Sequence, residues 1–233
     1  MKQILLVVVL LCGSAIAQDN RIAQFTVWEP KETQALAFQR GYQRHMQWHK
    51  TAGDPWDWHG WYFTSGPRIG HFFEATFNHA WADFDNPVDP VEDSLDSQEN
   101  VEPFAYMRSR FKAFFLKDQS IANSGSLRSK MIRMVTLNVT DVPSAVKIVD
   151  RYKNSNRSNS DVTTLLVFKV IDGGNANQVI ILIGSNSWEQ YGKTENIQDQ
   201  LANIENQMKL KSTIEDVTSE TLVFHPEMSL VPE

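Results

Sequence analysis

The stretch Phe77-Asn-His-Ala-Trp-Ala-Asp-Phe84 returns in the second half of the chain as Gly184-Ser-Asn-Ser-Trp-Glu-Gln-Tyr191, with Trp81 and Trp188 at matching positions. In both halves it follows a strand, a helix and a pair of strand-like segments. The pattern indicates two tandem copies of one small α+β unit. Five of the six histidines and six of the seven tryptophans lie in the first copy. A site on one half of a pseudo-symmetric fold would leave such an imbalance.

The N-terminal residues are typical of an export signal. Lys2 precedes an unbroken apolar run over residues 4–11, and Ala15-Ile16-Ala17 offers small residues for cleavage. The run is much shorter than the roughly 20 residues that span a bilayer. We therefore expect residues 1–17 to be a signal peptide, and the protein to be periplasmic or extracellular without membrane contact after cleavage. Cys12, the only cysteine, would be removed, so neither disulfides nor thiolate chemistry are expected.

The chain is acidic, with a net charge of −6. Much of the acid lies in one stretch without Lys or Arg, comprising Asp83, Asp85, Asp89, Glu92, Asp93, Asp96, Glu99 and Glu102. This charge argues against a nucleic-acid partner. Oxygen ligands for calcium are present, but the spacing of an EF-hand loop is not. We expect residues 83–103 to form a long solvated loop with at most one irregular helical turn, and we consider it a candidate lid over the first half.

Periodicity predicts the remaining elements. In the first half it predicts strands at 21–28, 58–64 and 69–77, a helix at 31–50 that Gly53 ends, and a second helix with Phe104, Met107, Phe111 and Phe114 on one face. In the second half it predicts strands at 131–139, 163–171, 178–183 and 220–225, and helices at 142–152 and 195–210. Both halves thus follow the β-α-β-β-α-β order of a ferredoxin-like unit, although the closing strand of the first is not evident.

Two such units can bury their open sheet faces against each other. On this element order and the repeated Trp-x-x-aromatic motif, the chain resembles the dimeric α+β barrel superfamily, fused in tandem. This group includes NIPSNAP-like and antibiotic-biosynthesis-monooxygenase-like proteins. The expected fold is α+β, with a first unit at residues 18–117, a linker at 118–126 and a second, mainly scaffolding unit at 127–233. The resemblance implies ligand binding between helices and sheet, with cofactor-free monooxygenases and haem proteins among the members.

His45 and His49 are the first candidate site residues. Their i, i+4 spacing places two imidazoles on one helix face, in line with Tyr42. They could share a ligand, or a transition metal together with His71 or His79. A metal site from two histidines alone is incomplete, and the alternative is a pair of partly buried, hydrogen-bonded histidines. We therefore assign them to ligand binding and keep metal binding as the weaker option.

The aromatic hairpin adds further candidates. If Gly66-Pro67 is a two-residue turn, Tyr62 lies opposite His71 and His59 lies opposite Glu74. A Tyr–His pair could transfer a proton to a bound molecule, and a carboxylate would fix one imidazole tautomer. The alternative is that these rings fill the barrel core.

His79 belongs to the first copy alone, because Asn186 stands at its position in the second. A single histidine can serve as an axial haem ligand, so haem is a candidate cofactor. Trp81 recurs as Trp188 and is expected to be architectural.

The sequence therefore predicts an exported protein that binds a small hydrophobic or aromatic molecule, haem among the candidates, with His45, His49, Tyr42, Tyr62, His71 and His79 as ligand-binding residues. Monooxygenase-like activity would follow from the resemblance. The alternative is a non-catalytic interaction or structural protein of the cell envelope. A monomer or a homodimer is expected. The chain lacks a phosphate-binding loop and a G-x-S-x-G motif, so nothing supports a nucleotide-dependent enzyme or a serine hydrolase.

Overall fold

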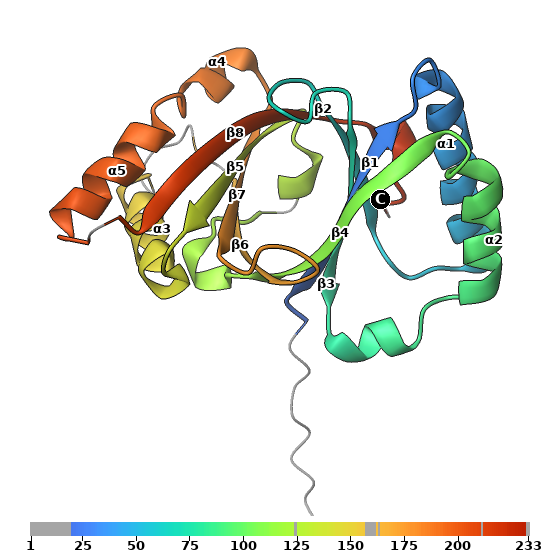
Figure 1. Ribbon diagram of the computed structural model, residues 1–233, viewed down its shortest axis with the longest axis horizontal. Helices are drawn as coiled ribbons and strands as arrows, with labels where there is room; N and C mark the ends of the chain where they lie inside the picture. Colours follow the sequence, from blue (N-terminus) through green and yellow to red (C-terminus); the bar gives the residue numbers. More distant parts are fainter. Residues whose placement is uncertain (1–19, 124, 157–161, 163, 211, 232–233) are drawn as a thin grey trace, which may run out of the picture.

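The computed structural model describes residues 20–123, 125–156, 162, 164–210 and 212–231. The predicted signal peptide lies outside these ranges. Within them, eight strands close into one antiparallel barrel, and the helices cover its outer surface at the two ends (Figure 1). No helix in the described part of the chain is long and apolar enough to cross a membrane.

The first half contains both helices that cover one end of the barrel. Its elements are β1 (Ile22–Pro30), α1 (Ala35–Ala52), β2 (Trp58–Phe63), β3 (Phe72–His79), a 3₁₀ turn (Trp81–Asp85), α2 (Pro90–Asn100) and β4 (Ala105–Phe115). Two further 3₁₀ turns, Lys117–Gln119 and Ser126–Arg128, lie between β4 and β5.

The second half repeats this order. Its elements are β5 (Met131–Val139), α3 (Val142–Asn156), β6 (Leu165–Asp172), β7 (Gln178–Ser185), the short helix α4 (Trp188–Gly192), α5 (Ile197–Gln207), β8 (Ile214–Phe224) and a final 3₁₀ turn (Pro226–Met228). Trp81 and Trp188 begin equivalent helical turns, and more than half of each side chain is exposed. The duplication is thus real in three dimensions.

The barrel consists of two four-stranded sheets. Each half has the strand order of a ferredoxin-like unit, β4-β1-β3-β2 and β8-β5-β7-β6. The halves join where β2 pairs with β8 and where β4 pairs with β6. The predicted α+β fold of two tandem units is confirmed, and their sheets also connect at both edges. The division at residues 117 and 127 stays a prediction.

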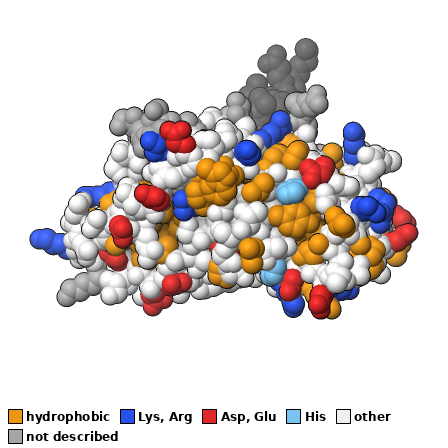
Figure 2. Space-filling view, turned by 90° about the horizontal axis from the view of Figure 1, so that it is seen from above, with side chains coloured by type: hydrophobic (Ala, Val, Ile, Leu, Met, Phe, Trp, Pro, Cys, Tyr) orange, Lys and Arg blue, Asp and Glu red, His pale blue; other side chains and the backbone are white. Residues whose placement is uncertain are grey.

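Aromatic side chains fill the barrel on the side of the first half. Phe25 lies at the centre, with ring centroids 5.2–5.7 Å from those of Phe73, Phe77, Phe111 and Phe168. The outer sheet face of the first half instead packs beneath α1, where Trp28, Phe38, Tyr42, Trp58 and Phe72 form a second cluster. Side chains of a strand alternate between the two faces, so neighbouring residues serve different clusters. On the molecular face in Figure 2, hydrophobic side chains lie between charged groups at the two ends.

The predicted acidic loop at 83–103 is wrong over most of its length, because residues 90–100 form α2. Asp89 caps this helix by accepting a hydrogen bond from the backbone N–H of Glu92, and Pro90 occupies the first turn. Both features favour a helix start. Glu92 and Asp93 in the first turn also interact favourably with the helix dipole.

The predicted helix on the Phe104–Phe114 spacing is also wrong, because this segment is β4. It pairs with β1 along its length and with β6 at its end. The polar residues Arg108, Arg110 and Lys112 fall on alternate positions, which is the period of a strand. Long-range pairing with β1 outweighed the helical spacing of the apolar residues. β4 is the closing strand that the sequence left unassigned.

The predicted hairpin register is wrong by one residue. Tyr62 pairs with Phe72, and Glu74 lies opposite Gly60 instead of His59. The connection runs through a longer turn in which the N–H of Ile69 bonds to the carbonyl of Gly66, rather than through a two-residue loop. A shift of one residue exchanges the faces of paired side chains.

Candidate functional site

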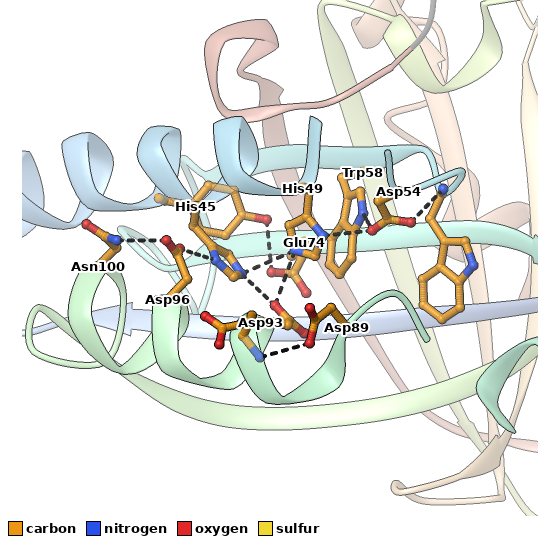
Figure 3. A network of polar contacts seen from close by, with 12 residues as sticks. His45, His49, Asp54, Trp58, Glu74, Asp89, Asp93, Asp96 and Asn100 are labelled. Atoms are coloured by element: carbon orange, nitrogen blue, oxygen red, sulfur yellow. Dashed lines mark hydrogen bonds and ion pairs between the residues drawn. The ribbon is translucent and has the colours of Figure 1, made fainter. Parts of the chain in front are cut away.

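The imidazoles of His45 and His49 lie between α1, α2 and the outer face of the sheet. Both belong to the buried face of α1, and 7% and 2% of their surfaces are exposed. The two helices approach closely here, because a Cβ on Gly41 would lie 1.8 Å from the carbonyl oxygen of Asn100. Only glycine allows this approach. It brings α2 side chains within reach of the histidines (Figure 3).

A carboxylate fixes the outer nitrogen of each imidazole. His45 Nδ1 donates to Asp96 of α2 at 2.7 Å, and His49 Nδ1 donates to Asp54 at 2.7 Å (Figure 3). Because an ionised carboxylate only accepts hydrogen bonds, the proton belongs on Nδ1 in both rings. This tautomer leaves a lone pair on each Nε2.

Further hydrogen bonds hold these two carboxylates in place. Asp96 accepts from the side-chain amide of Asn100 at 3.1 Å. Asp54 accepts from the indole N–H of Trp58 and from the backbone N–H of Trp56, each at 2.9 Å. The imidazole orientations are therefore set by groups outside the immediate site.

The two lone pairs converge on one carboxylate oxygen. The Nε2 atoms of His45 and His49 are 3.3 Å apart, and each lies 3.5 Å from Oδ1 of Asp93. Three electron-rich atoms facing one another repel unless a cation lies between them. With metal–ligand bonds of about 2.0–2.1 Å, tetrahedral ligands lie roughly 3.3 Å apart. The triangle has the size that one bound transition-metal ion requires.

A fourth acidic group, Glu74 of β3, is buried beside this triangle (Figure 3). Its Oε2 accepts from the indole N–H of Trp28 at 3.1 Å and from the hydroxyl of Tyr42 at 2.9 Å. Burial raises the pKa of Asp93, and the charge of Glu74 adds to that rise. Tyr42 thus orients Glu74 and does not belong to the triangle itself.

Burial raises the pKa values of the carboxyl groups at this site, whereas neighbouring histidines and hydrogen-bond donors lower them. Burial raises the pKa of Asp93, and the adjacent His49 and His45 oppose that rise. At Asp54 burial again acts upward, but the hydrogen bonds from His49, Trp56 and Trp58 outweigh it and lower the pKa. Burial, followed by the charge of Glu74, raises the pKa of Tyr42 well above its ordinary value.

The other predicted site residues lie elsewhere. Tyr62 packs against Phe72 and His225, and burial raises its pKa to about 12. His71 follows the hairpin turn, with its Nε2 atom 3.8 Å from Glu29. His79 packs against Trp56, with ring centroids 4.1 Å apart and the ring planes tilted by 43°. The structure therefore brings together Tyr42, His45 and His49 from the predicted set, and a ligand-binding role for all six residues stays a prediction.

Sequence reasoning missed Asp93 and Asp96, and also Asp54, and it paired Glu74 with His59 instead of placing it at this site. The first two lie in the stretch that we expected to be a loop, yet Asp89-Pro90 is a recognisable helix start. From that start, Asp93 and Asp96 fall on one helix face at i, i+3 spacing. Glu74 follows from the correct hairpin register, which places it on the outer face of the sheet.

No protein-family model and no curated protein matches the sequence. A protein of Lactobacillus acidophilus NCFM, provisionally named a monooxygenase, is similar in structure with a TM-score of 0.60 and 12% identity, over 92% of this chain and 100% of its own. An anthrone oxidase-like protein gives 0.59 and 9%, over 89% and 92%. A provisionally named chlorite dismutase gives 0.53 and 13%, over 87% and 94%.

This chain has the dimeric α+β barrel fold. In this dimeric α+β barrel, a single polypeptide supplies both halves. The low identities limit the similarity to the fold, so any function has to be argued from the side chains of the chain itself.

Proposed function

We propose that the protein binds one divalent transition-metal ion through His45 Nε2, His49 Nε2 and a carboxylate oxygen of Asp93. The observation that carries the proposal is the convergence of these three lone-pair atoms, with both Nδ1 atoms already donating to carboxylates. Carboxylate–histidine–metal arrangements are characteristic of biological metal sites, in which the outer carboxylate fixes the tautomer and raises ligand basicity.

The ligand set favours some metals over others. Two imidazoles and a carboxylate suit zinc, iron or other late first-row ions better than magnesium or calcium, which prefer oxygen ligands. Three protein ligands leave at least one coordination position for water or substrate, as in catalytic rather than structural sites. The side chain of Asp93 is 38% exposed, so solvent reaches the site from that side.

A bound ion would supply an activated water molecule or a coordination position for oxygen. Two similar structures, one provisionally named a monooxygenase and one an anthrone oxidase-like protein, have names that point to oxidation of an organic molecule and specify no metal. We propose monooxygenase-type chemistry on a small organic molecule as the reaction class to test first. Haem stays a weaker candidate, tested by titration of the purified protein and its Soret absorbance.

Metal binding can be measured directly. The protein is stripped with a chelator and supplied separately with Zn²⁺, Co²⁺ and, without oxygen, Fe²⁺, and bound metal is counted by mass spectrometry. We expect one ion per chain, and visible Co²⁺ bands typical of a four- or five-coordinate site. The double variant His45→Ala/His49→Ala should bind none, whereas His225→Ala, outside the site, should bind as the parent does. Equal binding by the double variant would contradict the proposal.

A subtler variant tests the orienting carboxylate. Asp54→Asn keeps the shape of the side chain but removes its charge from His49. Loss of such a partner costs about 10- to 100-fold in metal affinity. If Asp54→Asn binds the metal as tightly as the parent protein, the hydrogen bond from His49 Nδ1 to Asp54 does not contribute to metal affinity.

We also propose that the protein acts after export, on the basis of the N-terminal pattern. Mass spectrometry of protein recovered from its native compartment would then show a chain that begins after Ala17.

A further inference from the structure

A row of residues on the outer face of the sheet leads from the proposed metal site to an arginine. In this row Thr26 of β1 pairs with Glu74 of β3 on one side and with Arg110 of β4 on the other. Paired residues of antiparallel strands point to the same face of a sheet. Thr26 and Arg110 therefore share the face on which Glu74 accepts a hydrogen bond from Tyr42.

The side chain of Arg110 is directed along this row. Its Nε–H donates to the hydroxyl of Thr26 at 3.3 Å, and Thr26 is buried. This bond turns the guanidinium towards β1, and so towards Glu74, instead of away from the sheet. Burial raises the pKa values of Asp93 and Tyr42, and the charge of Arg110 opposes the rise at both groups. Arg110 thus acts on groups at the metal site itself.

Arg110 is available to a ligand. In the described part of the chain, its neighbours Arg108 and Lys112 each pair with a carboxylate, whereas no carboxylate lies within ion-pair distance of Arg110. The residue is exposed. Because only Nε is bonded to Thr26, the two Nη groups can form the planar fork that matches a carboxylate.

The charges at the site decide which end of a ligand lies at Arg110. Asp93 faces both imidazoles, Asp54 and Asp96 bind their Nδ1 atoms, and Glu74 is buried beside them (Figure 3). Four carboxylates more than offset the charge of one divalent ion. A ligand carboxylate is therefore better paired with the guanidinium, which leaves a neutral oxygen group for the open coordination position.

The spacing of the strands limits the length of the ligand. Adjacent strands lie about 4.8 Å apart, so roughly 10 Å separate the backbone of Glu74 from that of Arg110. This is the length scale of one ring with a group at each end.

We propose that the molecule bound at the metal site is a small monocarboxylic acid, whose carboxylate pairs with Arg110 and whose other end coordinates the ion. This inference rests on the proposed metal binding and adds the class of ligand to it.

The test compares 4-hydroxybenzoate with 4-hydroxybenzamide, which has a neutral amide in place of the carboxylate. The metal content of the Co²⁺-loaded protein is counted first, and each compound is then titrated while the visible Co²⁺ bands are recorded. We expect both compounds to change the bands, and the acid to bind about tenfold more tightly, which is the effect of one charge-assisted hydrogen bond. Arg110→Gln should lose this preference and keep its metal.

Two further variants separate charge from geometry. Arg108→Gln is the matched control, because it removes an exposed cation from the same strand and should keep the preference of the parent. Arg110→Lys keeps the charge without the planar fork and should retain part of the preference. If the Co²⁺-loaded parent fails to bind the acid or binds both compounds equally, or if the preference survives in Arg110→Gln, this inference alone is overturned. A parent protein that takes up no Co²⁺ would overturn the proposed function and this inference with it.

Discussion

The lowered pKa of His59 predicts a specific acid sensitivity. Burial and Arg128 lower this pKa from 6.5 to about 4 in the folded protein, whereas the unfolded chain restores the ordinary value. The contribution of neutral His59 to the free energy of unfolding is therefore fully present above pH 6.5. It is lost as the pH falls from 6.5 towards 4, because the unfolded chain then binds one more proton than the folded protein. A shift of about 2.5 units corresponds to about 3 kcal/mol, most of which should be lost by pH 4.5.

Urea unfolding measures this effect at pH 7.5, 6.5, 5.5 and 4.5, with a chelator present so that metal binding does not contribute. His59→Phe removes the titrating group, so its free energy of unfolding should fall by about 2–3 kcal/mol less than that of the parent between pH 7.5 and 4.5. The charged residues Arg21, Asp57 and Arg128 line the same pocket as His59, and they are common to both proteins. Parallel pH profiles for the parent and His59→Phe would refute the reasoning.

Two further predictions concern the pairing between the two halves and the contact between α1 and α2. The guanidinium of Arg68 pairs with Glu220, which is 1% exposed, and Arg68→Ala should cost about 3 kcal/mol in urea unfolding because a buried charge is left unpaired. The Lys112–Asp172 pair provides the control, because the carboxylate left behind is 54% exposed and Lys112→Ala should cost less than about 1 kcal/mol; equal losses would contradict this difference. Gly41→Ala should separate α1 from α2, costing about 1–3 kcal/mol and weakening Zn²⁺ binding in calorimetry. Gly192→Ala, which meets no neighbour within 4 Å, should be nearly neutral, and unchanged Zn²⁺ affinity in Gly41→Ala would show that the helix contact does not support the site.

The sequence predicted the repeated unit well because the repeat constrained the interpretation. Elements of the second half alternate or step cleanly, and β5, β6, β7, α3 and α5 lie within a few residues of their predicted bounds. In the first half, α1 and its end at Gly53 were also predicted. Gly53 adopts a left-handed φ of 73°, and its N–H bonds to the carbonyls of His49 and Lys50.

The errors occurred where local pattern and tertiary pairing differ. Phe104, Met107, Phe111 and Phe114 satisfy a helical spacing, but the hydrogen bonds of β4 come from β1, which is distant in sequence. The acidic stretch was expected to be a solvated loop because its sequence is charged and contains several prolines. A helix forms there without burying much of its surface: α2 buries only Asn100, and its cap and its contact with α1 stabilise it. The second of these errors concealed Asp93 and Asp96.

Two of the three converging ligand residues were accessible from the sequence. Helical spacing alone placed His45 and His49 together on one face. Their partner Asp93 required α2 to be recognised as a helix and packed antiparallel to α1. The position of Glu74 required the correct hairpin register, because a one-residue shift decides whether its carboxylate faces His59 or lies on the outer face with Tyr42.

The two joins of the barrel, β2 with β8 and β4 with β6, connect parts of a single chain. When two separate chains form such a barrel, dilution dissociates them, and both copies of any site must change together. Linkage within one chain replaces that second-order association by a first-order closure with a high effective concentration. The barrel should therefore stay closed at any dilution, and each half is free to diverge. A single asymmetric site per barrel, with the second half retained as its support, is the outcome that such freedom permits.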